Sequence, residues 1–497
     1  MGSLSVVDLS IVAATLVLAL GTGLLLGWRA KSATTTRSFL VAEHDLPWWA
    51  VLLSIVATET SSVTFLSVPG ISFGGDLRFL QLPLGYLVGR LFVARFLLPG
   101  FFQGDALTTY EVLGRRFGSG VKRASSLVFL ITRNGGDGLR LYLTALPLQK
   151  LTGLPLPAAI GVMSLVTIAY TFVGGMRAVV WTDVVQFFIY VAGGVLALVV
   201  AAGDGGIGGV LAESSAHGKL ACFDFSFDLA SANTFWAGLI GGAFLTIATH
   251  GTDQLMVQRY LGARDVREAR RALLVSGVVV LLQFALFLLV GLALAVWFRG
   301  HPEIGPIAKG DDAFSTFIAR RLTQIPGAIG LIFAALFAVS MSTLSSSLNA
   351  SAGALVNDWL KPTVARNWDD ARTLRATRLA TLGFGVAQAA AALAGASLKG
   401  NVVSAVLTIA GFTTGLTLGL FFLARWLGKA PADRTSARSQ GVAALAAFLV
   451  MLAVMTCVWR GTTIAWPWYS LIGSVGTLLV GRLLAALLVR RSPKMDH

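Results

Sequence analysis

Long apolar segments recur along the whole chain, and they constrain its fold more than any other feature. A helix of about 20 apolar residues, rising 1.5 Å per residue, crosses the hydrocarbon core of a bilayer. Short polar connections separate the segments. We therefore predict an all-α polytopic membrane protein with about thirteen transmembrane helices, at 6–27, 47–73, 78–100, 124–150, 156–173, 181–202, 234–258, 272–298, 326–357, 375–396, 401–424, 440–459 and 466–489.

The composition agrees with this class and argues against others. The 497 residues are 55% hydrophobic and 13% charged, whereas soluble domains carry about 25% charged residues. The net charge is +15, but the basic residues lie in short loops between apolar segments, which argues against a nucleic-acid-binding protein. Two cysteines, Cys222 and Cys457, give neither a disulfide framework nor a metal-ligand spacing.

The distribution of Lys and Arg predicts the orientation. With thirteen spans and the N-terminus outside, 25 of these residues fall in inner segments and nine in outer segments. The basic residues also follow the first apolar run, as in an uncleaved span, and do not precede it as in a signal peptide. We expect a multi-pass protein of the cell membrane with a cytoplasmic C-terminus.

The segment 47–73 is apolar at both ends but polar at its centre, where Glu59 stands among several Ser and Thr residues. Unpaired polar groups in hydrocarbon cost several kcal/mol, so we predict a broken helix that lines a cavity. Packing of Ser and Thr against neighbouring helices is the alternative, and this density of polar residues disfavours it. For Glu59 two roles stay open: a counter-charge for a proton or sodium ion, or a structural acid paired with an inner-loop arginine.

A second polar interruption lies in segment 234–258, around His250 and Asp253. When the ten segments after Pro47 are split into two sets of five, the two interrupted segments take matching positions, which is typical of an inverted-repeat transporter. We see no repeat at the level of single residues. The predicted division is an N-terminal span and inner loop, a first repeat, an outer loop, a second repeat, and two C-terminal spans with a short tail: 1–46, 47–202, 203–233, 234–424 and 425–497.

Two further groups of polar residues lie inside apolar segments. Ser342, Ser345, Ser346 and Asn349 share one helix face, and their oxygens suit a hard cation, although a Ser-rich packing face is the alternative. Arg133, Asp137 and Arg140 share another face, at positions i, i+4 and i+7. Buried charges in a membrane mark functional sites by default.

These three charges allow two interpretations. An internal Arg–Asp pair would only brace the helix. If Asp137 neutralises one arginine, the other is free to bind an anionic solute, because the group has a net positive charge. His250 and Asp253 stand three residues apart, and we favour a solute hydrogen bond or support of the helix break over a metal site or an acid–base pair.

Four motifs follow one another along the chain: Ala57-x-x-Thr60-Ser61, Gly174-Gly175-Met176-x-Ala178-x-x-Trp181-Thr182-Asp183-x-x-Gln186, Thr252-Asp253-Gln254-x-x-Val257-Gln258-Arg259 and Ser342-Thr343-Leu344-Ser345-Ser346-x-Leu348-Asn349. Through them the chain resembles the sodium/solute symporter family over nearly its whole length. The resemblance implies a LeuT-like five-plus-five core that works by alternating access.

The resemblance also implies site residues. Two carbonyls of the first core helix, with one carbonyl and two hydroxyls of the eighth, would bind sodium: Ala57, Thr60, Val339, Ser342 and Thr343. Some members hold a second sodium ion, which would fall on Asp183, Ser345 and Ser346. Ser61 and Thr64 resemble the solute contacts of sialic-acid carriers. The carboxylate-binding arginine of those carriers aligns with Gly136, so neither neighbouring arginine takes that role by resemblance.

We expect a symporter that imports a small organic solute, with a carboxylate as one candidate group, coupled to one or two Na+ ions. The expected partners are the solute, sodium and the lipid bilayer, with no nucleic acid and no obligate protein partner. A membrane-embedded solute sensor or a proton-coupled carrier on the same fold is the alternative. A channel or an intramembrane enzyme is less compatible, because polarity is concentrated at the breaks and no nucleophile–base pair is evident. The predicted solute contacts are Ser61, Thr64, Arg133, Asp137, Arg140, His250 and Asp253.

Overall fold

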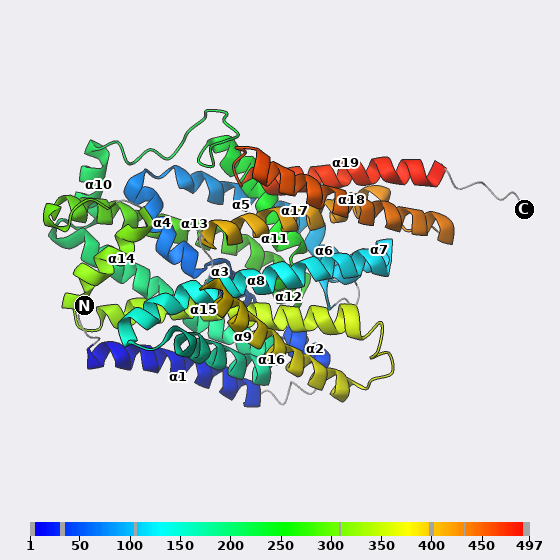
Figure 1. The fold of residues 1–497 in the computed structure, drawn as a ribbon, viewed down its shortest axis with the longest axis horizontal. Coiled ribbons are helices and arrows are strands. Elements are labelled where there is room, and N and C mark those ends of the chain that lie inside the picture. Colours follow the sequence, from blue (N-terminus) through cyan, green and yellow to red (C-terminus); the bar gives the residue numbers. More distant parts are fainter. Residues whose placement is uncertain are drawn as a thin grey trace, which may run out of the picture.

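The computed structural model describes residues 5–29, 35–103, 107–307, 310–396, 402–431 and 433–490. These residues form an all-helical bundle in which most helices run along the long axis (Figure 1). No β-strand forms among them, and an isolated backbone bridge joins Leu46 to Ala263. The predicted all-α class is confirmed for this part of the chain.

The helices coincide with the predicted apolar segments and add short helices in the connections. The α-helices are α1 (Val6–Arg29), α2 (Thr36–Val41), α3 (Trp48–Glu59), α4 (Ser62–Gly74), α5 (Gln81–Phe92), α6 (Leu98–Phe101), α7 (Thr109–Phe117), α8 (Ser119–Thr152), α9 (Leu156–Ala202), α10 (Gly206–Ala216), α11 (Gly242–Thr252), α12 (Gln254–Leu261), α13 (Val266–Arg299), α14 (Gly310–Arg320), α15 (Ala328–Ala354), α16 (Asp370–Gly395), α17 (Val402–Leu427), α18 (Arg434–Gly461) and α19 (Trp468–Arg490). Short 3-10 or π segments are η1 (Ala42–His44), η2 (Arg78–Leu80), η3 (Val93–Leu97), η4 (Gly203–Gly205), η5 (Ala237–Gly241), η6 (Pro302–Ile304), η7 (Leu322–Gln324) and η8 (Leu355–Leu360).

Helix α9 contains two of the predicted spans. It has 47 residues, and a straight helix of that length would be about 70 Å long, more than twice the hydrocarbon core. At Gly175 the backbone has φ 53° and ψ −146°, a conformation that side-chain-bearing residues rarely adopt. A Cβ atom at this position would also lie 2.4 Å from the Phe39 carbonyl oxygen. The chain therefore bends at Gly175, between the segments predicted at 156–173 and 181–202.

Both predicted helix breaks are present. Helix α3 ends at Glu59 and α4 begins at Ser62, with an angle of 63° between them. Helix α11 ends at Thr252 and α12 begins at Gln254. Segments 47–73 and 234–258 are thus interrupted at the polar residues that led us to predict a break.

The number of membrane crossings is not fixed by helix length and apolarity. Among the described residues seven helices satisfy both criteria, or up to eight if α3 and α4 form one span. By these criteria α9 is a single span despite its bend. Helix α8 is not included, and its central part contains Arg133, Asp137 and Arg140. The thirteen-helix count, the inverted repeat and the orientation of the termini stay predictions.

Helix α15 lies at the centre of the bundle and brings the polar groups together. The most apolar 18-residue part of its span is 94% buried, the highest share among the seven helices. It packs against α1, α3, α8, α9 and α16. Its hydroxyl-rich face therefore lies next to the first helix break and away from lipid.

Candidate functional site

The first helix break leaves backbone carbonyls without their helical partners. The N–H of Thr60 donates to the Val56 carbonyl at 3.1 Å, which is the last regular bond of α3. The next N–H, from Ser61, donates to the Thr64 hydroxyl instead, and the Thr64 N–H donates to the Ser61 hydroxyl, both at 3.4 Å. The carbonyls of Ala57 and Thr60 therefore lose the amide donors four residues further on. Both residues are buried.

Hydroxyls of α15 lie beside this break. The Thr58 hydroxyl is 3.4 Å from that of Ser342, and the Thr343 hydroxyl donates to the Val339 carbonyl at 3.3 Å. Ser342 and Thr343 are also buried. The five residues predicted to bind sodium thus supply only oxygen atoms, at a break where carbonyls lack donors. This donor set fits Na+, and a bound ion would tie the end of α3 to α15.

The hydroxyl of Thr60 is engaged elsewhere. It accepts a hydrogen bond from Gln283 Nε2 at 2.6 Å, and Gln283 Oε1 accepts from the Tyr190 hydroxyl at 2.8 Å. Because α9 and α13 hold the hydroxyl in this way, the carbonyl is the oxygen of Thr60 that remains for a cation.

The residues of the predicted second sodium site surround an arginine that sequence reasoning missed. The fully buried Arg259 contacts Asp183 Oδ2 at 3.3 Å and donates to the hydroxyls of Ser54, Thr58 and Ser346. The hydroxyls of Ser345 and Ser346 donate to the Ser342 carbonyl. The second sodium ion stays a prediction, and the guanidinium of Arg259 competes with it for Asp183 and Ser346. A charged residue at the end of a predicted span was the available signal.

The structure also gives Glu59 a partner, Arg90 on α5. Arg90 is fully buried and forms an ion pair with Glu59, and its Nε donates to the Ser276 hydroxyl at 3.2 Å. The imidazole Nε2 of His250 lies 3.5 Å from Glu59 Oε2, and Nδ1 lies 2.6 Å from the Tyr260 hydroxyl. Glu59 is therefore a paired acid. This favours the structural alternative of the two left open, except that the partner lies within the predicted span 78–100 and not in an inner loop.

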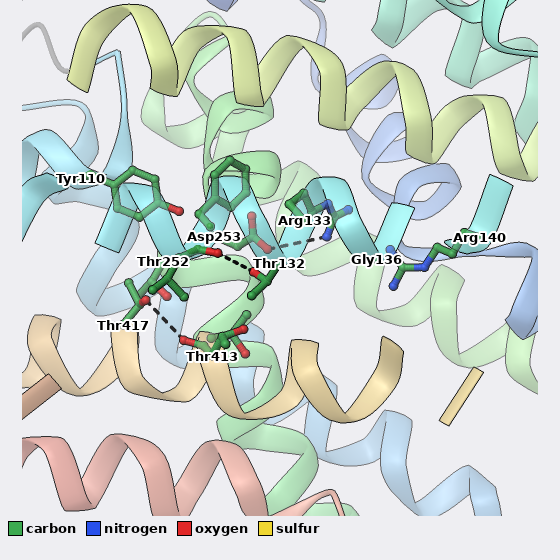
Figure 2. Close-up of a pocket in the computed structure, with 12 residues that line it drawn as sticks. Tyr110, Thr132, Arg133, Gly136, Arg140, Thr252, Asp253, Thr413 and Thr417 are labelled. Atoms are coloured by element: carbon green, nitrogen blue, oxygen red, sulfur yellow. Dashed lines mark hydrogen bonds and ion pairs between the residues drawn. The ribbon is translucent and has the colours of Figure 1, made fainter. Parts of the chain in front are cut away.

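A cavity of about 50 Å³ opens beside the second break (Figure 2). Asp253 caps the start of α12, where Oδ1 accepts from the Leu255 N–H at 2.9 Å. Arg133 and Arg140 reach the cavity from α8, and Figure 2 places Gly136 between them. The full lining is Tyr110, Val128, Phe129, Thr132, Arg133, Gly136, Arg140, Thr252, Asp253, Thr413, Thr414 and Thr417.

The charges in this cavity are unequally paired. Asp137 is fully buried and contacts both arginines: Arg133 Nε at 2.9 Å, and Arg140 Nη1. Arg133 also lies 3.9 Å from Asp253, between two carboxylates. Arg140 has a single ion-pair partner, Asp137, which it shares with Arg133. The buried Nε of Arg140 has no hydrogen-bond partner. Two aspartates thus balance two arginines, which corrects the expected net positive charge.

Three predicted solute contacts have other partners. Ser61 and Thr64 form a capping box at the start of α4, where each hydroxyl accepts from the other residue's N–H. His250 belongs to the Glu59–Arg90 group. None of the three lines the cavity, whereas Arg133, Arg140 and Asp253 do and Asp137 holds both arginines.

Comparisons with known proteins identify the family of this chain. Residues 39–433 match the model of the sodium:solute symporter family. The chain is similar to the human sodium/iodide cotransporter, with 30% identity over 90% of this chain and 69% of that protein. It is also similar to human sodium-coupled monocarboxylate transporter 2, with 31% identity over 84% of this chain and 68% of that protein.

Two solved structures have a similar fold. A Na+-coupled sialic acid symporter, in a substrate-bound outward-open state, superposes with a TM-score of 0.84 at 25% identity and covers 97% of this chain and 98% of that one. A nucleobase-cation-symport-1 family transporter gives a TM-score of 0.58 at 14% identity and covers 92% and 96%. The match at residues 39–433 covers more than half of the chain, and the protein therefore belongs to the sodium:solute symporter family.

Proposed function

We propose that this sodium symporter imports a small solute with a carboxylate group, which binds Arg140 in the cavity beside the second helix break. One observation carries the proposal: the Arg140 guanidinium lines the cavity with a buried Nε that has no acceptor. A carboxylate supplies such an acceptor in a charge-assisted hydrogen bond. Thr132 and Thr252 line the same cavity and offer hydroxyls for the rest of the solute.

The size of the cavity favours a small solute. Its volume of about 50 Å³ corresponds to about three to five water molecules, if one water needs 10–15 Å³. A short monocarboxylate suits that space better than a sugar acid does. Members of the same family are named as carriers of iodide and of monocarboxylates, which are small anions.

The sodium ion is proposed to bind at the first break, through Ala57, Thr60, Val339, Ser342 and Thr343. The charge balance supports one ion per cycle. The cavity is neutral, so a carboxylate brings one negative charge and a single Na+ compensates it. Because Arg259 already neutralises Asp183, a second cation there would meet a guanidinium within the same cluster.

We further propose a LeuT-like five-plus-five inverted repeat within about thirteen transmembrane helices, with the N-terminus outside. The two breaks support it, because Thr60 and Ser61 interrupt the first core segment and Asp253 interrupts the sixth. Discontinuous helices at corresponding positions of two halves are typical of inverted-repeat transporters. Alternating access would then expose both breaks to each side of the membrane in turn.

Uptake into proteoliposomes tests the proposal. With an inward Na+ gradient, we expect labelled short monocarboxylates to accumulate in preference to a neutral sugar. Arg140→Lys should weaken uptake more than the retained charge explains, because the planar fork is lost, and Arg140→Ala should abolish it. Arg366→Ala, on an exposed loop, is the control for loss of a positive charge.

Two outcomes would overturn the proposal. One is a preferred solute without an acidic group, carried with wild-type affinity by both Arg140 variants. The other is accumulation that follows a proton gradient and ignores Na+, which would favour the proton-coupled alternative. If a solute binds without being transported under any gradient, the sensor alternative gains support.

A further inference from the structure

A second cavity, of about 580 Å³, lies between α7, the start of α8 and the start of α18. Its walls combine two kinds of side chain. Three arginines contribute guanidinium groups: Arg115, Arg116 and Arg438. Three further lining residues have apolar side chains: Val121, Val442 and Leu445. Figure 1 shows the ends of these helices together, away from α10 and α14.

Direct ion pairs among the described residues do not neutralise the arginines of this cavity. Among the described residues none of the three arginines forms an ion pair with a carboxylate. Arg116 donates from Nε to the Gly428 carbonyl at 2.7 Å and from Nη2 to Gln440 Oε1 at 2.8 Å. Its third nitrogen, Nη1, is buried and has no hydrogen-bond partner. The nearby acid Glu111 instead accepts from the Leu107 N–H.

Two of the three apolar residues, Val442 and Leu445, lie on α18. Helix α18 is one of the seven helices apolar enough to cross the membrane. Val442 is 51% exposed, and Leu449 and Val450, further along the helix, are 53% and 46% exposed. The cavity thus has arginines at its polar end and continues into an exposed apolar helix face. A phosphate ester with an acyl chain matches both parts.

We propose that this cavity binds an anionic phospholipid, with the phosphate among Arg115, Arg116 and Arg438 and an acyl chain along Val442 and Leu445 of α18. Basic pockets between transmembrane helices are known to bind anionic head groups on the cytoplasmic side. The positive-inside distribution predicts that this end of the bundle faces the cytoplasm.

The cavity is connected to the second helix break through α7. The Thr109 N–H, at the start of α7, donates to Gln254 Oε1 at 2.7 Å, and Gln254 Nε2 donates to the Leu107 carbonyl at 3.0 Å. Gln254 follows Asp253 directly. A lipid that holds α7 in place therefore supports the helix that begins at the solute site, and we expect anionic lipid to increase uptake. This last expectation rests on the proposed function.

Binding is tested with the purified full-length protein in a neutral detergent. Phosphatidylglycerol is titrated while thermal unfolding is followed, with phosphatidylcholine and inorganic phosphate as parallel probes. Arg115→Ala combined with Arg438→Ala removes two exposed charges and leaves Arg116, which contacts Gln440, in place. At about 1 kcal/mol for each basic residue, the double variant should bind phosphatidylglycerol at least about tenfold more weakly. Arg366→Ala combined with Arg375→Ala removes two exposed arginines elsewhere and should bind like wild type.

Three results would overturn the lipid site: equal affinity in the double variant and wild type, equal effects of phosphatidylcholine and phosphatidylglycerol, or an effect of inorganic phosphate as large as that of the lipid. The last result would indicate a site for soluble phosphate. Uptake in proteoliposomes with increasing phosphatidylglycerol gives the second measurement. If the lipid binds as expected but no solute is carried in any lipid, the proposed function fails and the lipid site stands.

Discussion

The two helix breaks share one backbone conformation at one residue each, but they differ in length and in chemistry: Thr60 and Ser61 form the first, and Asp253 alone forms the second. Thr60 and Asp253 share φ near −77° and ψ near 127°: the values are −76° and 129° for Thr60, and −77° and 126° for Asp253. The first break offers neutral carbonyls and hydroxyls, which suit a cation that must be released in every cycle. The second places a carboxylate next to two arginines and a cavity. The side chains and free carbonyls at each break thus determine what it can bind.

A buried network joins the two breaks. Glu59, one residue before the first, pairs with Arg90, while His250, three residues before the second, contacts both. Tyr260 on α12 completes the group through His250. Glu59 beside the first break and His250 beside the second therefore contact each other and the same arginine. We expect substitutions in this network and at each break to have separable effects.

The largest effect is expected at the shared network, from Arg90→Ala. This change leaves Glu59 in the bundle without its ion-pair partner, and breaking a buried pair costs about 3–5 kcal/mol. We expect a large fall in the midpoint of thermal unfolding in detergent and low yield of folded protein. Arg95→Ala, one turn further on and exposed, should stay close to wild type. Equal stability of Arg90→Ala and wild type would show that Glu59 does not depend on Arg90.

Loss of both α15 hydroxyls should mainly affect sodium. In Ser342→Ala combined with Thr343→Ala, two oxygen ligands disappear. Interactions with a charged group are worth about 1.5–3 kcal/mol, so the half-saturating Na+ concentration should rise at least about tenfold. The Hill coefficient for Na+ should be close to one in wild type. Ser347→Ala is the control, because its hydroxyl accepts from Gln388 on α16. Unchanged Na+ dependence in the double variant would exclude these ligands.

Asp253→Asn should affect the solute and leave sodium unchanged. Asparagine still accepts from the Leu255 N–H and keeps the cap of α12. It removes the negative charge that lies 3.9 Å from Arg133. The cavity then gains net positive charge, and the KM for an anionic solute should fall severalfold, while the half-saturating Na+ concentration stays the same. A higher KM would indicate that Asp253 itself binds the solute.

Features that depend on local pattern could be predicted from the sequence. Polar residues inside apolar segments located both breaks, because hydrocarbon does not tolerate them unpaired. Helical spacing placed Arg133, Asp137 and Arg140 on one face, and the ion pairs confirm that face. The ends of helices and the short helices of the connections were less accessible, since capping and packing set them.

Partners distant in sequence could not be predicted. Arg90 and Glu59 are 31 residues apart, and Arg259 and Asp183 are 76 apart, so no helical period relates them. Asp253 was known as a candidate, but its position next to Arg133 follows from the packing of the second break against α8. A single sequence contains no information on such pairs, and the expected positive charge of the cavity was wrong for this reason.

The smallest effect concerns Ser61, for which the resemblance predicts a solute contact and the structure shows a helix cap. Its hydroxyl accepts from the Thr64 N–H at 3.4 Å, a long bond. Ser61→Ala should therefore lower the free energy of unfolding by about 0.5–1 kcal/mol. Ser61→Asn keeps a capping oxygen, so its stability should return to the wild-type value.

The solute KM separates the two roles of Ser61. If the hydroxyl only caps α4, both variants should keep the wild-type KM, because Ser61 does not line the cavity. If it also contacts the solute, Ser61→Asn should raise the KM although its stability is restored. In that case the solute extends from the second break to the first. The first break would then bind both sodium and part of the solute, and only the sodium ion would be restricted to one break.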